Sequence, residues 1–156
     1  MLAAHGVEQL ADVRTIPKSR RNPQYNRDEL ATALQAENIK YVHLPGLGGL
    51  RHPRKDSINT AWQNASFRGY ADYMQTPEFE RNLRELIDFA DDYRTAIMCA
   101  ESVPWRCHRS LIADALAGRG IIAEHIMSKT SRKPHTLTSF AKIEGQTVTY
   151  PGLADL

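Results

Sequence analysis

The sequence predicts an α/β domain with three layers, in which helices cover both faces of a mainly parallel sheet. Short apolar segments alternate along the chain with longer amphipathic ones, an order typical of parallel sheets with right-handed crossovers. The chain has 156 residues, which suits one domain with one core. With 42% hydrophobic and 24% charged residues, its composition is ordinary for a globular protein. We therefore expect a single domain over residues 1–156, in which 127–156 form an irregular C-terminal extension.

The first part of the chain predicts two strands with a helix between them. Residues 7–13 carry a short apolar pattern and read as a strand entering a loop. Asn26 followed three residues later by Glu29 resembles a capping box, which predicts a helix over 27–37. Residues 39–44 alternate between apolar and polar and predict the second strand, followed by a long loop to about residue 60.

The second part predicts three helices and two further strands. Thr76 before Pro77 is a typical helix start, and the apolar spacing that follows indicates one long amphipathic helix. The remaining elements are expected to be helices over 67–74 and 109–119 and strands over 95–100 and 121–126. We expect 128–136 to be a loop and 146–150 to be a short edge strand.

The composition indicates in which cellular compartment the protein is found and whether its thiols are oxidised. No apolar run approaches the roughly 20 residues that a membrane span needs. The first residues do not resemble a signal peptide, and two cysteines are too few for a secreted disulfide framework. The sequence therefore predicts a cytoplasmic protein without a membrane partner, and free thiols.

Basic residues are concentrated in the loops that follow the first three strands. The net charge of +2 says little by itself, but these loops hold ten of the 20 Lys and Arg: Arg14, Lys18, Arg20, Arg21, Arg27, Arg51, Arg54, Lys55, Arg106 and Arg109. Acidic residues gather instead on the helices before the third strand. Ligands of parallel sheets bind beyond the carboxyl ends of the strands, where helix N-termini also favour phosphate. We therefore expect an anion-binding edge; an ordinary solvated surface is the alternative reading.

The segment from Thr95 to Gly120 holds both cysteines and most of the candidate catalytic groups. Cys107 lies where a helix begins, beside His108 and two arginines, and this setting lowers a thiol pKa. Cys99 and Glu101 follow the buried strand, where Cys99 is either a small core residue or functional and Glu101 either a base or a salt-bridge partner. Trp105, Arg106 and Arg109 crowd the same short stretch.

Zinc and regulated disulfide chemistry are two further possibilities for these residues. Cys99, Cys107, His108 and His125 supply soft ligands, although their spacing is poor for a structural zinc site. The spacing of the cysteines also differs from the C-x-x-C redox motif. His43 and His125 each lie within a predicted strand, where a hydrogen-bonded histidine competes with a catalytic one.

Several blocks of the sequence resemble the family of domains of unknown function DUF488, whose members are small bacterial α/β proteins. The blocks are Asp12-Val13-Arg14 with Pro17 and Ser19, residues 21–26, residues 41–45 from Tyr41 through His43 to Pro45, Leu47-Gly48-Gly49, Cys99-Ala100-Glu101, Cys107-His108-Arg109 and Thr149-Tyr150-Pro151. The resemblance implies a further strand before the first one predicted here, ending in a Thr-Ile-Gly-His-Ser-like motif. Met1 falls after that point, so we expect either a truncated or misstarted chain with an unpaired sheet edge, or an edge that a partner completes.

A weaker resemblance links the cysteine loop to rhodanese and cysteine phosphatase domains. Those domains also place an Asp-Val-Arg strand early and a cysteine loop between strand and helix. Here six residues separate Cys99 from Arg106, where the phosphatase loop has five, and no glycines line the loop. The likeness is an analogy of fold position only.

These observations lead to one preferred function and two alternatives. The preferred one is binding of a phosphate-containing anion, a nucleotide or nucleic acid, through Arg14, Ser19, Arg21, Arg106 and Arg109. In this function Glu101 and His108 orient groups or exchange protons. The first alternative is sulfur or phosphoryl transfer through Cys107 or Cys99. The second is a zinc-bearing or adaptor domain without catalysis. The protein can also form a homo-oligomer in this reading, and Asp12, Tyr41, His43, Gly48, Gly49 and His125 are further site candidates.

Overall fold

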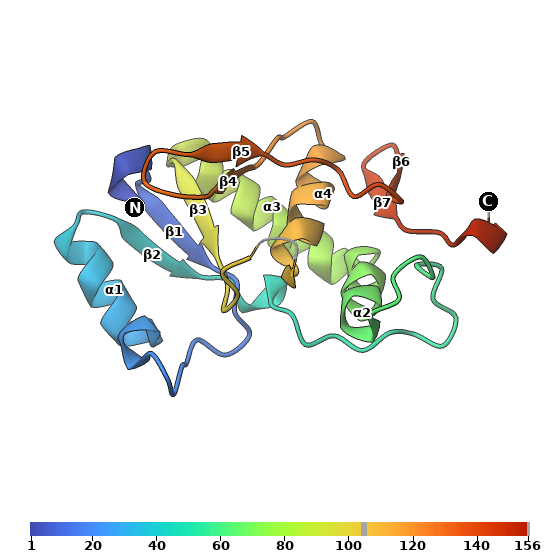
Figure 1. The fold of residues 1–156 in the computed structure, drawn as a ribbon, viewed down its shortest axis with the longest axis horizontal. Helices are drawn as coiled ribbons and strands as arrows, with labels where there is room; N and C mark the ends of the chain where they lie inside the picture. Colours follow the sequence, from blue (N-terminus) through green and yellow to red (C-terminus); the bar gives the residue numbers. More distant parts are fainter. Residues whose placement is uncertain (104–105, 156) are drawn as a thin grey trace.

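The centre of the molecule is a three-stranded parallel sheet with the strand order β2-β1-β3 (Figure 1). The computed structural model describes residues 1–103 and 106–155. The strands are β1 (Gln9–Asp12), β2 (Lys40–His43) and β3 (Thr95–Met98). The register pairs Asp12 with His43 on one side and with Met98 on the other, so the strands end at one common edge. The predicted α/β architecture with a parallel sheet is confirmed.

Helices cover both faces of this sheet. One face packs against α1 (Arg27–Ala36) through a small cluster that includes Leu10, Leu30 and Leu34. The other face carries the larger core beneath α2 (Ala65–Met74), α3 (Pro77–Asp92) and α4 (Arg109–Ala117) (Figure 1). α2 lies beyond the strand ends in Figure 1 and packs against α3 and α4, so it closes the larger core from the side.

The helix starts show which capping predictions hold. Thr76 caps α3 as expected, because its Oγ1 accepts a hydrogen bond from the Phe79 N–H at 3.2 Å. Asn64 caps α2, accepting from Ser66 N and Phe67 N, so this helix begins two residues before the predicted start. The predicted capping box at Asn26 is wrong, because Asn26 Oδ1 instead accepts from the Ser19 N–H at 2.7 Å. Asn26 thereby ties the loop after β1 to the start of α1.

The chain after α4 forms two hairpins. β4 (Glu124–Ile126) pairs antiparallel with β5 (Arg132–Pro134), and β6 (Lys142–Glu144) pairs with β7 (Thr147–Thr149). The strand expected over 121–126 is present only over Glu124–Ile126, and it lies in this hairpin and not in the central sheet. The loop expected over 128–136 is wrong because it contains β5, whereas β7 lies within the edge strand expected over 146–150. The β4–β5 hairpin is held to α4 by a hydrogen-bond chain from His125 through His135 to Asp114.

Short 3-10 turns complete the described chain: Ala3–His5, Pro23–Tyr25, Pro45–Leu47 and Leu153–Asp155. Across residues 1–103 and 106–155, no helix is long and apolar enough to cross a membrane.

Candidate functional site

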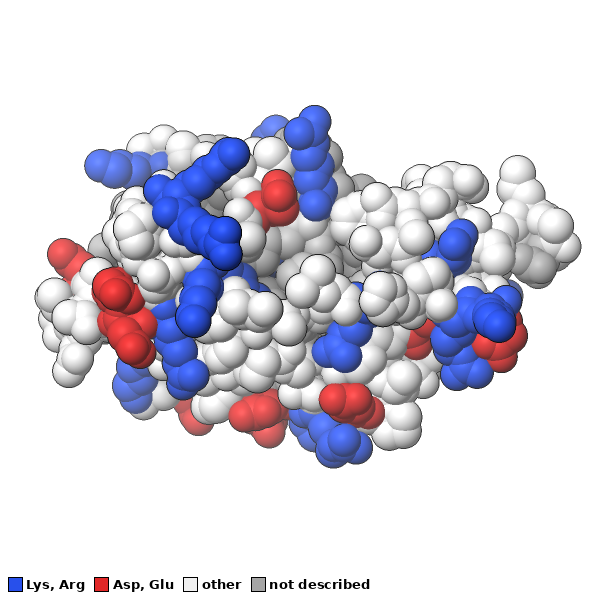
Figure 2. Space-filling model, turned by 90° about the horizontal axis from the view of Figure 1, so that it is seen from below, with Lys and Arg blue, Asp and Glu red and all other residues white. Residues whose placement is uncertain are grey.

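Three loops meet at the edge where β1, β2 and β3 end. They are the loop from β1 to α1, the turn Pro45–Leu47 with the glycines after it, and the segment that joins β3 to α4. Because the strands are parallel and in register, the sequence motifs that follow each strand come together here. Figure 2 views the molecule from this side.

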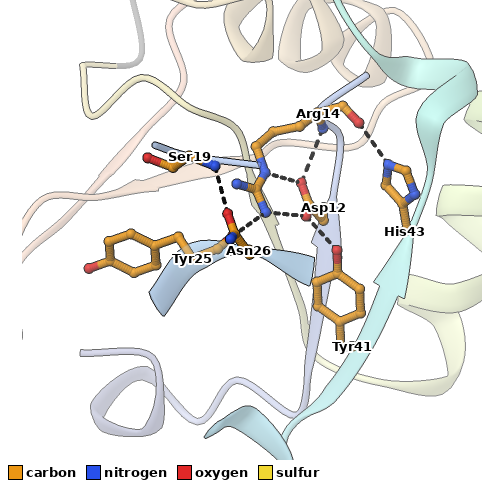
Figure 3. A network of polar contacts seen from close by, with 7 residues as sticks. All are labelled: Asp12, Arg14, Ser19, Tyr25, Asn26, Tyr41 and His43. Carbon is orange, nitrogen blue, oxygen red and sulfur yellow. Dashed lines mark hydrogen bonds and ion pairs between the residues drawn. The ribbon is translucent and has the colours of Figure 1, made fainter. Parts of the chain in front are cut away.

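Asp12 and Arg14 form a buried ion pair at the end of β1 (Figure 3). Arg14 Nε and Nη2 donate to Asp12 Oδ1 and Oδ2 at 2.9 and 2.7 Å, and the Tyr41 hydroxyl donates to Oδ2 at 2.5 Å. Asp12 is fully buried and Arg14 is 6% exposed. Burial raises the pKa of Asp12, but the hydrogen bonds from Arg14 and Tyr41 outweigh it and leave that pKa below its usual value. The carboxylate is thus held in its charged form.

The same network fixes the loop after β1. Arg14 Nη2 also donates to the Tyr25 carbonyl oxygen at 2.7 Å, and His43 Nε2 lies 2.7 Å from the Arg14 carbonyl oxygen (Figure 3). His43 is therefore satisfied by a backbone hydrogen bond, the structural one of its two predicted roles. The buried guanidinium of Arg14 donates its hydrogen bonds to Asp12 and to the Tyr25 carbonyl oxygen. These contacts give Arg14 a structural role and leave it less accessible to a ligand.

Gly48 and Gly49 let the turn after β2 lie close against two other loops. A Cβ on Gly48 would lie 2.3 Å from Thr15 Oγ1 and 2.9 Å from Thr15 Cα, so a larger residue requires the backbone to move. A Cβ on Gly49 would lie 3.3 Å from His108 Nδ1. The Thr15 hydroxyl donates to the Gly49 carbonyl oxygen at 3.1 Å. The glycines therefore bring the second loop into contact with the first and the third.

Cys99 and Cys107 are joined in a disulfide that links the end of β3 to the start of α4. The prediction of free thiols was wrong because it rested on composition and compartment alone. The fold brings the two ends of this short segment together, so the sulfur atoms become neighbours although eight positions separate them in the sequence. Cys107 is buried, and Cys99 is partly buried.

His108 and Arg109 surround the Cys107 sulfur. His108 Nδ1 lies 3.6 Å from Cys107 Sγ, and Arg109 donates to the same sulfur from its backbone N and from Nε, both at 3.4 Å. His108 Nε2 lies 3.2 Å from the Val13 carbonyl oxygen, so Nε2 carries the proton and Nδ1 presents a lone pair to the sulfur. Burial lowers the pKa of His108, which favours this neutral form.

Glu101 and Arg106, the two exposed candidates of this segment, make no side-chain hydrogen bond to the Cys107 sulfur within the described part of the chain. Arg109 Nη2 donates to the backbone oxygen of Glu101, not to its carboxylate. Glu101 and Arg106 are exposed, and Trp105 lies outside the described residues. The hydrogen bonds therefore do not support the prediction that the Glu101 carboxylate orients Arg106 or Arg109.

The basic residues of this edge divide into engaged and open side chains. Arg54 pairs with Asp56, and the Arg51 guanidinium lies 3.6 Å from the centre of the Tyr73 ring. Lys18, Arg20 and Arg21 are exposed and make no side-chain ion pair within the part of the chain that the structure describes. Figure 2 shows Lys and Arg side chains gathered in its left half. The open cations come mainly from the loop after β1, together with Arg106.

The residues that were candidates for zinc binding do not form a metal site in the described part of the chain, and His125 contacts another histidine instead. Among residues 1–103 and 106–155, no group of three or more His, Cys, Asp or Glu is placed to hold a metal ion. His125 Nε2 is instead 2.8 Å from His135 Nδ1, and His135 Nε2 is 2.7 Å from Asp114 Oδ1. Sequence reasoning missed His135 and Asp114. The signal was available, since Asp114 is a lone acid in the apolar run LIADALA and such a buried carboxylate needs partners.

Most of the chain matches a known protein family. The family described as "Domain of unknown function DUF488" matches residues 1–116. That range contains all three sheet strands, α1 to α3, the cysteine segment and most of α4. No curated protein and no solved structure matches the chain.

Proposed function

The chain belongs to the DUF488 family, and for it we propose binding of a phosphate-containing anion, a nucleotide or nucleic acid, at the edge where β1, β2 and β3 end. The observation that supports this best is that the exposed basic loop after β1 and the start of α4, which carries Arg109, both lie at this edge, where His108 Nε2 lies 3.2 Å from the Val13 carbonyl oxygen. Cations gathered at one edge raise the local concentration of anions. A guanidinium and a helix start favour phosphate in particular.

Specific groups support the proposal. Arg109 is half-buried, so its charge is less screened by water than that of a surface arginine. Ser19 Oγ accepts a hydrogen bond from Asn22 N at 3.0 Å, which leaves its O–H proton for a ligand oxygen. Arg21 and Arg106 are exposed and complete the set, whereas Arg14 drops out because Asp12 and Tyr25 occupy it.

The test measures binding of a short fluorescent oligonucleotide at several salt concentrations. Replacing Arg109 by Ala is expected to weaken binding at least about tenfold, the effect of losing one charge-assisted contact. The matched control is Arg94→Ala, an exposed arginine directly before β3 and therefore at the opposite edge of the sheet. Equal loss in both variants, or binding that does not respond to salt, would contradict the proposal.

A second candidate function is thiol chemistry at Cys107, and the contact with His108 Nδ1 favours it. In the reduced protein the Cys107 proton can pass to this lone pair, and the resulting thiolate lies beside Arg109. The thiolate is then a nucleophile for sulfur or phosphoryl transfer.

Alkylation rates of the reduced protein test this second candidate. Each cysteine is followed against pH by peptide mass, and Cys107 is expected to react with an apparent pKa below about 8.5. Replacing His108 by Ala is expected to raise that pKa. Slow reaction with an ordinary pKa in both proteins would exclude Cys107 as a nucleophile.

A further inference from the structure

The disulfide between Cys99 and Cys107 is a reactive group that the proposed anion binding does not use. It joins the residue directly after β3 to the segment that leads into α4. Cys107 is only 3% exposed, whereas Cys99 is partly exposed. A molecule from solution therefore reaches the Cys99 sulfur more easily than the Cys107 sulfur.

The hydrogen bonds of the two sulfur atoms differ as well. Cys107 Sγ accepts from the backbone N–H and from the Nε–H of Arg109, both at 3.4 Å. Cys99 Sγ accepts from the Glu101 N–H at 3.2 Å and lies 3.6 Å from the Glu101 carbonyl oxygen. Once the disulfide is reduced, this carbonyl oxygen can accept the S–H proton of Cys99. Cys107 instead faces two donors, one of them charged, so the negative charge of the reduced pair is favoured on Cys107.

This asymmetry determines which sulfur leaves when a thiolate attacks the disulfide. In thiol–disulfide exchange, the sulfur that is more stable as a thiolate leaves faster. His108 Nδ1 lies 3.6 Å from Cys107 Sγ, but neutral His108 presents a lone pair there, so the stabilising charge comes from Arg109. Attack at the exposed Cys99 thus expels the better leaving group, Cys107.

A thiol that approaches Cys99 meets a positively charged edge. Arg109 is nearest, because its Nε donates to Cys107 Sγ and its Nη2 to the backbone oxygen of Glu101. The Val13 N–H donates to the Met98 carbonyl oxygen at 2.9 Å, so Cys99 also lies beside the start of the loop after β1. The exposed cations of this edge are Lys18, Arg20, Arg21 and Arg106. Such a field attracts anionic thiols and repels cationic ones.

We propose that the protein oxidises anionic low-molecular-weight thiols through this disulfide, with Cys99 as the attacked sulfur and Cys107 as the leaving thiolate. The substrate thiolate forms an S–S bond to Cys99 Sγ, and the electron pair of the Cys99–Cys107 bond leaves with Cys107 Sγ. A second substrate thiolate then attacks the substrate sulfur of the mixed disulfide. Cys99 leaves as a thiolate and takes a proton from water.

The two steps convert two substrate thiolates into one substrate disulfide and reduce the protein disulfide by two electrons. No sulfur atom is transferred and no phosphate takes part, so this activity goes beyond the proposed function and beyond its second candidate. It shares with the proposed function only the positive charge of the strand-end edge.

The first experiment compares the rates at which three small thiols reduce the oxidised protein. Mercaptoethanesulfonate is anionic, mercaptoethanol neutral and cysteamine cationic, and each rate is divided by the concentration of thiolate present. At low ionic strength the anionic thiol is expected to react about tenfold faster than the cationic one, and added salt should reduce this ratio. Equal rates for all three would overturn the assignment of anionic substrates.

The attacked sulfur is identified by peptide mass after a brief reaction and an acid quench. Arg106 lies between the two cysteines, so trypsin places them on separate peptides. The mixed disulfide is expected on the peptide that contains Cys99. Substrate attached to Cys107 would overturn the proposed direction of attack.

The leaving group is tested with neutral mercaptoethanol, whose thiolate owes little to the attraction of the edge before it reacts. Arg109→Ala is expected to slow reduction about tenfold, the effect of one charge-assisted hydrogen bond. Arg109→Lys keeps the charge, should give an intermediate rate and serves if the Ala variant does not fold. Arg94→Ala at the opposite edge is the matched control and should react like the wild-type protein. Wild-type rates in both Arg109 variants would overturn the role of Arg109.

The two proposals fail separately. If the anionic thiol is preferred and the oligonucleotide does not bind, the proposed function is wrong and the exchange activity stands. If the oligonucleotide binds and mercaptoethanesulfonate leaves the disulfide intact, the exchange activity is wrong and anion binding stands.

Discussion

Replacing Arg14 by Ala is expected to lower the free energy of unfolding by about 3–5 kcal/mol at pH 7.5. The substitution removes three hydrogen bonds, two to Asp12 and one to the Tyr25 carbonyl oxygen. The fully buried Asp12 carboxylate then keeps the Tyr41 hydroxyl and the backbone N–H of residue 14 as donors, with no opposite charge. A buried charge that loses its partner typically costs this amount.

The pH dependence of this loss distinguishes a buried charge from lost packing. In the wild-type protein the pKa of Asp12 is lowered, so its contribution is present above the unfolded pKa of about 3.9 and is lost as the pH falls through the folded pKa. Without Arg14, burial dominates and raises the pKa of Asp12 above the unfolded value. In the folded variant, Asp12 then takes up a proton as the pH falls, which relieves the unpaired buried charge. The difference in unfolding free energy between wild type and variant should therefore shrink from pH 7.5 to pH 4.5.

Urea denaturation at both pH values, followed by tryptophan fluorescence, measures the effect. Arg14→Lys keeps the charge and loses the two parallel hydrogen bonds, so it should cost less and also serves if the Ala variant does not fold. A loss below about 1 kcal/mol at pH 7.5, or a loss that is independent of pH, would refute the assignment of Arg14 as the partner of a buried Asp12 charge.

Three further stability predictions concern the loops and helix starts, each measured by the same denaturation. Gly48→Ala should cost about 1–3 kcal/mol, because its Cβ would lie 2.9 Å from the Thr15 Cα. Asp72→Ala should cost at least about 2 kcal/mol, because it removes the acceptor of the Arg54 N–H and of the Ser57 hydroxyl and leaves the buried Asn59 Nδ2 with Gln75 as its remaining acceptor. Asn64→Ala should cost about 1 kcal/mol through loss of the α2 cap. If the free energy of unfolding of a variant equals that of the wild-type protein within experimental error, the contact named for that residue does not stabilise the fold.

The parallel core was predictable because its elements carry strong periodic patterns. The long helix Pro77–Asp92 has its capping Thr, its Pro and an apolar stripe, and the structure agrees with all three. The β1, β2 and β3 segments are short apolar runs between helices, an order that leaves few topologies open. Local signals and the global fold agree in this part of the chain.

The two C-terminal hairpins were not predictable from the same signals. β5 is the exposed tripeptide Arg132–Pro134, which has neither apolar alternation nor a favourable strand composition. Beside its pairing with β4, the contacts of His125, His135 and Asp114 join residues of three separate segments. A sequence pattern shows that a segment is extended, but the partner of that segment is set by tertiary contacts.

The roles of the site residues were only partly predictable, and Arg14 shows why. Asp12 and Arg14 are two positions apart in extended chain, so their side chains point to the same face. That spacing already indicates a local ion pair, and the structure contains one. The prediction that Arg14 binds an anion assumed that every cation of the loop is equally accessible to a ligand, whereas Arg14 is paired with Asp12.

The cations that can hold a ligand are those the protein has not already used. Arg14, Arg51 and Arg54 belong to the ten basic residues of the strand-end loops, yet each is engaged by a carboxylate or an aromatic ring. An engaged guanidinium helps to shape the edge, because it fixes a loop, but a ligand has to displace its partner before it can bind. The attraction for anions therefore rests first on the open side chains of the loop after β1. Arg109 donates to the Cys107 sulfur and to the Glu101 backbone oxygen, neither of which is a carboxylate or an aromatic ring, so its charge is not neutralised by these contacts. Arg109 is thus the residue at which the proposed anion binding and the proposed thiol chemistry meet.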